Sequence, residues 1–173
     1  MKTFRMRKAG NFLLAVLAIF SSTIHCRAGE KDMRPLFEKY GIGIYDQGDR
    51  GTCSVFAVTG LLEFEYARKQ GKAIPLSVEF LNWASNQITG EMEDGSYFSD
   101  AVMALKKYGV CSDELFPYYI RNYSRKAEPS KSALKEARQR RDARLIWIKE
   151  WDPETGMSDE QIMEVKKQII NEH

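Results

Sequence analysis

Residues 46–57 combine side chains that could perform nucleophilic chemistry. The stretch is a polar loop with two glycines, followed at once by an apolar run. Thr52 is a plausible helix N-cap, which places Cys53 in the first turn of a helix running towards Gln70. A thiol there lies at the positive end of the helix dipole, beside unpaired backbone N–H groups. Both favour the thiolate, which is the nucleophilic form.

The side-chain amide of Gln47 could donate a hydrogen bond close to the same sulfur. Gln47 precedes Cys53 by six positions, and Gly48 and Gly51 allow the loop between them to turn sharply. One amide donor and the Cys53 backbone N–H would together form a two-donor oxyanion hole. We therefore take Cys53 as the candidate nucleophile and Gln47 as the candidate oxyanion donor. The alternative is a buried structural cysteine at a helix start.

Residues 50–54, Arg-Gly-Thr-Cys-Ser, resemble the active-site segment of the papain-like cysteine peptidases. The signature of that family is Cys-Gly-Ser/Ala-Cys-Trp/Tyr. The nucleophile and the glycine two positions before it match. Arg50 stands where the family has its first cysteine, which removes the disulfide usually made there, and Ser54 stands where the family has an aromatic residue.

Further landmarks follow in the family's order, so that the resemblance covers residues 45–118. Residues 76–79, Leu-Ser-Val-Glu, resemble the Leu-Ser-Glu-Gln that opens the family's second helix, and residues 94–97, Asp-Gly-Ser-Tyr, resemble the Asn-Gly-Gly-Tyr of its substrate cleft. Residues 108–110 and 116–118 resemble the Tyr-Gly-Ile and Tyr-Pro-Tyr that close the first lobe. Several landmarks in the same order make a chance resemblance improbable.

The resemblance implies peptide-bond hydrolysis through a Cys53 thiolate and a thioester intermediate, with no cofactor and no metal ion. It also implies that backbone groups of Gly95 and Ser96 bind a peptide in extended form, as an added strand. The expected partner is a peptide or protein substrate. Residues 86–96 are acidic, but their spacing fits no known metal site, and we favour a solvated loop there.

The apolar pattern predicts three helices that position these residues. The first begins at Cys53, the second is capped by Ser77, and the third runs from residue 99 or 100 to Tyr108. The resemblance implies a mainly α fold for this chain, the helical lobe of a papain-like fold that is α+β when complete. The chain would then be truncated before the β-rich lobe.

Three residues of the first predicted helix carry further expectations. Gly60 lies in its middle, where glycine costs about 1 kcal/mol relative to alanine, so we expect close packing of a neighbour. Glu63 lies in an apolar run and is expected to have a buried partner, because a lone buried charge is costly. Gly71 is a natural C-terminal stop.

The rest of the chain divides by composition. Residues 121–144 carry nine basic residues against three acidic ones, which predicts a charged helical insertion with a solvated face rather than an anionic partner. Ser130 or Ser132 could cap a helix there that runs through Arg141. Residues 158–161, Ser-Asp-Glu-Gln, form a capping-box pattern that opens the final helix. The predicted segments are a signal peptide at 1–28, a short N-terminal segment at 29–44, the nucleophile lobe at 45–120, the insertion at 121–144, and a strand (145–148) plus a final helix at 145–173.

Residues 1–28 have the layout of a secretory signal peptide. Basic residues precede an apolar run at 12–20, which is too short for a comfortable membrane span. We therefore expect a secreted or periplasmic protein without a stable membrane span, and a lipoprotein lipidated at Cys26 is the alternative. Removal of this segment lowers the basic residues from 26 to 21, against 24 acidic ones, so the chain offers no reason to invoke nucleic acid.

Two cysteines remain after that segment, Cys53 and Cys111. An exported protein could pair them in a disulfide, and the sequence leaves this open. The family resemblance requires Cys53 to be free of a disulfide, and Cys111 is then expected to be a small buried apolar residue.

A cysteine peptidase also needs an imidazole base and a group that orients it. The family places its His and Asn about 130–150 residues after the nucleophile, whereas 120 residues follow Cys53. His25 belongs to the signal peptide and His173 is terminal, so neither suits the role. We expect a truncated peptidase that is inactive alone. The alternatives are a split peptidase completed by a second chain and a non-catalytic peptide- or protein-binding module.

Overall fold

The protein is described by a computed structural model over residues 32–120, 127–142, 146–149 and 154–171, the side chains of 170 and 171 excepted. The predicted signal peptide lies outside these residues. The helices within them are α1 (Arg34–Tyr40), α2 (Cys53–Gln70), α3 (Val78–Thr89), α4 (Phe98–Tyr108), the 3-10 helix η1 (Asp113–Leu115), α5 (Lys131–Ala137) and α6 (Asp159–Asn171). The described residues include no strand beyond an isolated antiparallel bridge between Leu76 and Ser112. The mainly α fold is confirmed.

Local signals set the ends of the helices. The Ser77 hydroxyl accepts a hydrogen bond from the Phe80 backbone N–H at 2.9 Å, so Ser77 caps α3 as predicted. Gly71 ends α2 with φ 81°, a left-handed conformation that glycine adopts without a steric penalty. The third helix begins one residue earlier than predicted, at Phe98.

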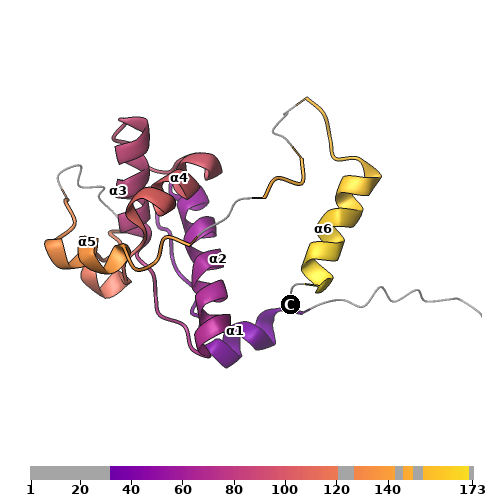
Figure 1. Ribbon diagram of the computed structural model, residues 1–173, viewed down its shortest axis with the longest axis horizontal. Coiled ribbons are helices and arrows are strands. Elements are labelled where there is room, and N and C mark those ends of the chain that lie inside the picture. The colour runs from indigo at the N-terminus through magenta and orange to yellow at the C-terminus, as the bar shows by residue number, and fades with distance from the viewer. Residues whose placement is uncertain (1–31, 121–126, 143–145, 150–153, 172–173) are drawn as a thin grey trace, which may run out of the picture. The chain divides into compact units, whose positions relative to one another are not determined.

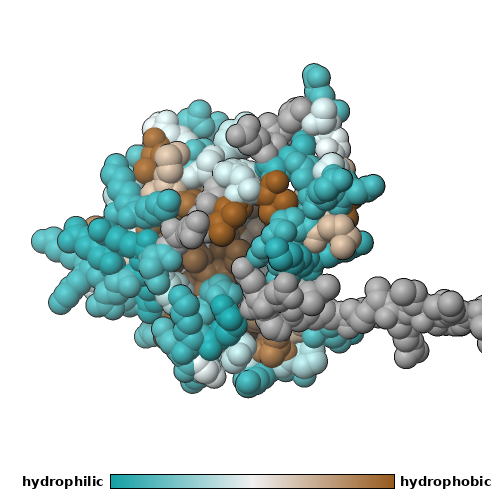
Figure 2. All heavy atoms as spheres, turned by 45° about the vertical axis from the view of Figure 1, so that its right-hand side comes forward, coloured by the Kyte–Doolittle hydropathy of each residue, from teal (hydrophilic) through white to brown (hydrophobic). Residues whose placement is uncertain are grey.

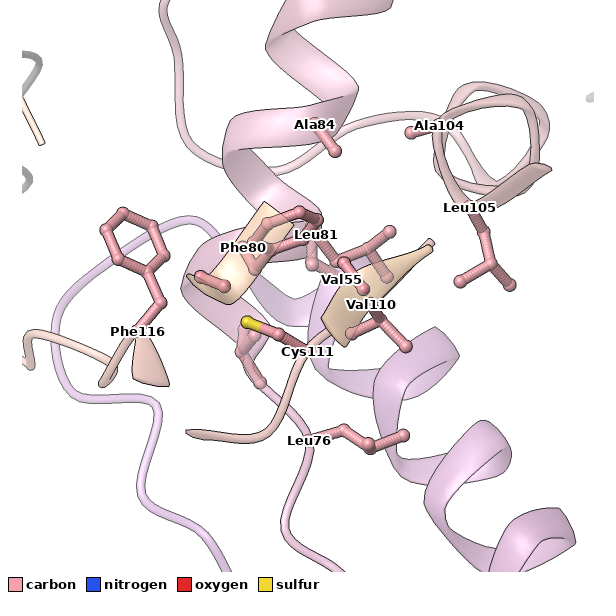
Figure 3. Close-up of a cluster of buried hydrophobic side chains, with 13 residues drawn as sticks. Val55, Leu76, Phe80, Leu81, Ala84, Ala104, Leu105, Val110, Cys111 and Phe116 are labelled. Atoms are coloured by element: carbon pink, nitrogen blue, oxygen red, sulfur yellow. The ribbon is translucent and has the colours of Figure 1, made fainter. Parts of the chain in front are cut away.

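Helices α2, α3 and α4 pack around one apolar core (Figure 1). The segment after α4 completes this core with Val110 and Cys111, both fully buried (Figure 3). Backbone hydrogen bonds tie this segment to the start of α3: the Ser77 N–H donates to the Cys111 carbonyl at 2.9 Å. The start of α2, which carries Cys53, is thus fixed to a packed core through Val55.

Helix α5, in the segment 121–144 predicted to be a charged helical insertion, contributes small side chains to the same core. Its Lys131 and Lys135 are exposed, so the helix also has a charged face toward solvent. Its Ala133 and Ala137 are fully buried. Ser130 caps the helix, accepting from the Ala133 N–H at 3.1 Å, but the helix ends at Ala137 rather than at Arg141. Small side chains let α5 approach closely, since a Cβ on Gly109 would clash with the Ala137 carbonyl.

Gly60 differs from its prediction. A Cβ built at Gly60 meets nothing within 4 Å, so no neighbour packs closely against it. The prediction for Glu63 is confirmed: it is buried, and the Tyr45 hydroxyl donates to its Oε1 at 2.8 Å. Helix α2 therefore leaves open space beside Gly60, which we call the open wall, near the buried carboxylate of Glu63.

Two further predictions are wrong. Residues 146–148, the described part of the predicted strand, form no strand, and Ile146 and Trp147 are exposed. The loop predicted at 86–96 is also shorter, because α3 continues to Thr89.

Helix α6 begins with a reciprocal capping box. The Gln161 N–H donates to the Ser158 hydroxyl at 3.3 Å, and the Ser158 N–H donates to Gln161 Oε1 at 2.9 Å, as predicted. Its apolar residues Ile162 and Ile169 remain exposed. On the face of the molecule drawn in Figure 2, brown apolar side chains gather between teal hydrophilic ones. Among the described residues, no helix combines the length and apolarity needed to cross a membrane.

Candidate active site

Cys53 is the first residue of α2 and is exposed, whereas Cys111 is fully buried; both thiols are free. Burial raises the pKa of Cys111 to about 12, because the thiolate is poorly solvated in the core. Cys111 therefore stays a protonated thiol at neutral pH, among the side chains shown in Figure 3. Of these two cysteines, only Cys53 can meet a ligand.

Thr52 occupies the N-cap position, but its side chain makes no capping hydrogen bond, which corrects the prediction. Its hydroxyl lies 2.6 Å from the Tyr118 hydroxyl, and Tyr118 in turn donates to the Gln47 carbonyl at 2.9 Å. Thr52 thus joins the loop to the segment after η1. The backbone N–H groups in the first turn of α2 are left uncapped by Thr52, beside Cys53.

Gln47 lies in a loop closed by its own side chain. Its Nε2 donates to the Arg50 carbonyl at 2.5 Å. A primary amide carries two N–H donors, so the second remains for a ligand. Of the two glycines in this loop, Gly48 has a positive φ of 63°, and Gly51 does not. The role of Gln47 as an oxyanion donor stays a prediction.

Arg50 anchors residues 46–52, which we call the nucleophile loop because they precede Cys53, the candidate nucleophile. It does so through a buried ion network that was not predicted from the sequence. Its Nη1 lies 2.5 Å from Glu79 Oε2, and its Nη2 lies 2.7 Å from Asp94 Oδ1. Nη1 also donates to the Tyr119 carbonyl at 2.9 Å, and the guanidinium lies 4.6 Å from the centre of the Tyr118 ring. One side chain thereby joins four segments: the loop, α3, the 90–97 loop and the end of the lobe.

Burial alone would lower the pKa of Arg50, but hydrogen bonds to Asp94 and Glu79 outweigh it and raise the pKa above its ordinary value. The guanidinium is therefore always charged. Removing one partner of a buried ion pair leaves an uncompensated charge, so the three groups depend on one another. Asp94, predicted to be solvated, is instead part of this network.

The predicted peptide-binding residues follow Asp94 directly. Gly95 has φ 82°, and a Cβ there would lie 2.5 Å from the Gly51 carbonyl oxygen, so the 90–97 loop touches the nucleophile loop. The Gly95 N–H donates to Asn82 Oδ1 at 2.9 Å, and the Ser96 N–H donates to the Ser54 hydroxyl at 3.2 Å. Both N–H groups have partners within the protein, and peptide binding at Gly95 and Ser96 stays a prediction.

A sequence signal for the Arg50 network did exist. Glu79 follows Val78 and precedes Phe80 on α3, and all three are buried. A carboxylate in such a run needs hydrogen-bond donors or a cation as partners, and Arg50, a cation, stands where the family has a cysteine. The pairing could not be deduced from spacing, because the two residues lie 29 positions apart in the sequence.

Comparisons with known proteins agree with this geometry. Procathepsin L of Felis catus is 34% identical over 94 residues, which cover 54% of this chain and 28% of that protein. Cathepsin 7 of Mus musculus is 32% identical over 99 residues, covering 57% of this chain and 30% of that protein. The chain therefore spans less than a third of the length of these relatives. No protein-family model matches it.

Among solved structures, xylellain, a cysteine protease from Xylella fastidiosa, aligns with a TM-score of 0.51 and 23% identity. The alignment covers 56% of this chain and 41% of that one. This likeness concerns the fold.

Proposed function

From the likeness of its helical core to the nucleophile-bearing lobe of papain-like cysteine peptidases, we propose that this chain supplies the thiol of a cysteine peptidase. The observation that carries the proposal is the exposed, free Cys53 at the first residue of α2, next to a loop held by buried ion pairs. Cys111, the alternative thiol, is buried.

In this proposal the Cys53 thiolate attacks the carbonyl carbon of a peptide bond. The Cys53 backbone N–H and the second N–H of the Gln47 amide stabilise the oxyanion that forms. The amine leaves with a proton from a general acid, which gives a thioester at Cys53, and water then hydrolyses the thioester. The role of the Arg50 network is to keep the loop in place while charge develops on the oxyanion.

The proton transfers need a group from outside the described residues, since these contain no histidine. Further polypeptide of the same gene product or a second chain could provide an imidazole. Gly95 and Ser96 would hold the substrate backbone, with their carbonyl groups as acceptors. A substrate that also uses the Ser96 N–H has to displace the Ser54 hydroxyl from it.

The second candidate is a non-catalytic module that binds peptides or proteins on the same face. Ser54 favours it, because its hydroxyl accepts a hydrogen bond from a backbone N–H in the predicted peptide site. Such a module needs no imidazole and no free thiol.

The proposal is tested with the purified native gene product, wild type and Cys53→Ser, on a fluorogenic peptide amide with and without a thiol reductant. We expect Cys53→Ser to lower the rate of hydrolysis by about a thousandfold or more, because the nucleophile is lost. Cys111→Ala is the matched control and keeps the activity of a correctly folded protein. Hydrolysis that is unchanged in Cys53→Ser contradicts the peptidase, and peptide binding that persists in this variant without any hydrolysis in the wild type favours the binding module.

We further propose that the protein acts outside the cytoplasm. The support is the signal-peptide pattern of residues 1–28. N-terminal sequencing of the exported protein checks it, with a new terminus expected close to residue 28.

A further inference from the structure

A cavity of about 230 Å³ lies beside α2, and none of the candidate catalytic or peptide-binding residues lines it. Its apolar walls include Phe56, Leu76 and Val78, and its polar groups come from Tyr45, Asp46, Thr59, Glu63, Asp113 and Tyr118. Pockets for drug-sized ligands have about 300–1,000 Å³. This cavity therefore fits a small molecule or a single side chain.

Gly60 forms part of the wall of this cavity. A Cβ at this position would meet nothing within 4 Å, so the missing side chain leaves open space. Glycine in mid-helix weakens the helix, and the packing of the core does not require it here. Packing within the fold therefore does not explain why residue 60 is a glycine.

Thr59 also lines this cavity, and its hydroxyl has no hydrogen-bond partner among the described residues. Thr59 is 2% exposed, and no described residue donates to or accepts from its Oγ1. Buried polar atoms are normally hydrogen-bonded, and an exception calls for an explanation. A ligand in the cavity would supply the missing partner.

Carboxylates dominate the charge around the cavity. Glu63 accepts from the Tyr45 hydroxyl at 2.8 Å and from the Leu76 N–H at 3.4 Å, and Asp113 accepts from the Tyr118 N–H at 3.3 Å. All of these donors are neutral, and among the residues that the structure describes no lysine or arginine lines the cavity. Glu63 is buried and Asp113 is half-buried. A carboxylate withdrawn from water normally has a cation as a partner, so both retain the capacity to bind one.

We propose that this cavity binds a primary ammonium group carried on an apolar stem. An ammonium group has three N–H donors and no acceptor, which matches Glu63, Asp113 and the unpartnered Thr59 oxygen. The apolar walls suit a hydrocarbon stem. An anion would be repelled by the carboxylates, and a purely apolar ligand would leave Thr59 unsatisfied.

The ammonium group could belong to a free amine or to a lysine side chain of a polypeptide. The first probe is n-butylammonium, titrated into the full chain and followed by amide NMR shifts, with n-butanol as the neutral analogue. We expect binding about tenfold or more tighter for the ammonium, as charge-assisted hydrogen bonds allow. The largest shifts are expected at Thr59 and Gly60.

A second probe distinguishes the sources. It is the peptide acetyl-Ala-Lys-Ala-amide, with its Nε-acetyl-lysine form as the control. Tighter binding of the peptide than of n-butylammonium assigns the site to a lysine side chain, and the reverse assigns it to a free amine. Both results support the shared chemistry.

Two variants place the binding in the cavity. Gly60→Leu fills the open space and is expected to abolish binding, while Gly60→Ala keeps the fold as a matched control. Glu63→Gln keeps the shape but loses the charge, so the tenfold preference over n-butanol should vanish. Butylammonium binding no tighter than butanol binding in the wild type, or unchanged in Gly60→Leu, overturns the proposal.

The pH dependence gives an independent readout. Burial raises the pKa of both Glu63 and Asp113 above their ordinary values. Ammonium binding requires ionised carboxylates, so affinity should fall as the pH is lowered through these pKa values. Asp46, Tyr45 and Tyr118 are the other titratable groups that face the cavity. Affinity that is constant from pH 4 to 8 contradicts the proposal.

Discussion

Glu79 on α3 and Glu63 on α2 are both nearly fully buried, but they have different partners. Glu79 pairs with the Arg50 guanidinium at 2.5 Å, so a charge lies next to a charge. Glu63 accepts hydrogen bonds from the Tyr45 phenol and the Leu76 backbone N–H, which are neutral. The first carboxylate serves to hold a loop in place. The second is hydrogen-bonded without being neutralised.

Because of this difference, Glu79 has a structural role in the Arg50 network, whereas Glu63 belongs to the proposed binding cavity. The Arg50 network joins the nucleophile loop to α3 and to Asp94, and its charges are paired with one another. The Glu63 region has a cavity, an open wall at Gly60 and an unpartnered hydroxyl at Thr59. Buried acidic residues in one small core can thus serve structure in one place and recognition in another.

The largest loss of stability is expected when the Arg50 ion network is broken. Arg50→Met leaves Glu79 and Asp94 without their cation, and breaking a buried ion pair in this way costs about 3–5 kcal/mol. Urea unfolding of the full chain measures the loss of free energy of unfolding. Arg34→Met is the control, since Arg34 pairs with Asp32 at the surface, where solvent screens the pair, and its loss should leave stability nearly unchanged. A similar loss in both variants would contradict the comparison.

Removing the unpartnered hydroxyl of Thr59 should stabilise the protein, whereas Arg50→Met destabilises it. Thr59→Val keeps the shape of the side chain and removes a buried polar atom that has no partner. We expect the free energy of unfolding to rise by about 1–2 kcal/mol, within the range for an unsatisfied buried group. Thermal and urea unfolding check this. A destabilised Thr59→Val would show that the hydroxyl has a partner in solution.

A smaller gain in stability is expected from a substitution at Gly60. Gly60→Ala adds a Cβ that meets nothing within 4 Å, so the helix should gain about 0.8–1 kcal/mol. Gly109→Ala is the contrasting variant, because its Cβ would clash with the Ala137 carbonyl at a positive φ of 83°. Urea unfolding should show stabilisation at Gly60 and destabilisation at Gly109. A loss at both positions would mean that the space beside Gly60 is filled.

The smallest expected effect is the contribution of Glu63 to the pH dependence of stability. Burial raises the pKa of Glu63 in the folded state, so the folded protein binds more protons than the unfolded chain above the ordinary value of 4.5. Its contribution to stability is therefore full below that pH and is lost as the pH rises through the raised pKa. Glu63→Gln should lose less stability than the wild type between pH 4.5 and 7.5. Equal slopes of unfolding free energy against pH would contradict this.

The sequence predicted what depends on neighbours along the chain. The Ser77 cap, the Gly71 stop and the capping box at Ser158 each involve residues within a few positions, and each was confirmed. The start of α2 at Cys53 was confirmed for the same reason. Sequence also indicated a buried partner for Glu63, because an acidic residue in an apolar run needs one.

Contacts between distant residues were not predictable in the same way. Arg50 and Asp94 lie 44 positions apart, so spacing could not reveal the pair, and Asp94 was taken for a solvated residue. Gly60 was expected to touch a neighbour, since glycine in a helix usually implies close packing, but space lies beside it. The strand predicted from residue 145 rested on an apolar run whose described part is exposed.

Arg50 also determines how the nucleophile loop responds to its surroundings. It stands where the family resemblance implies a disulfide cysteine, and it joins the loops by charge. A thiol reductant does not break an ion pair, so the redox state of the exposed Cys53 thiol can be changed without loss of this support. A disulfide at the position of Arg50 would be open to cleavage by the same reductant.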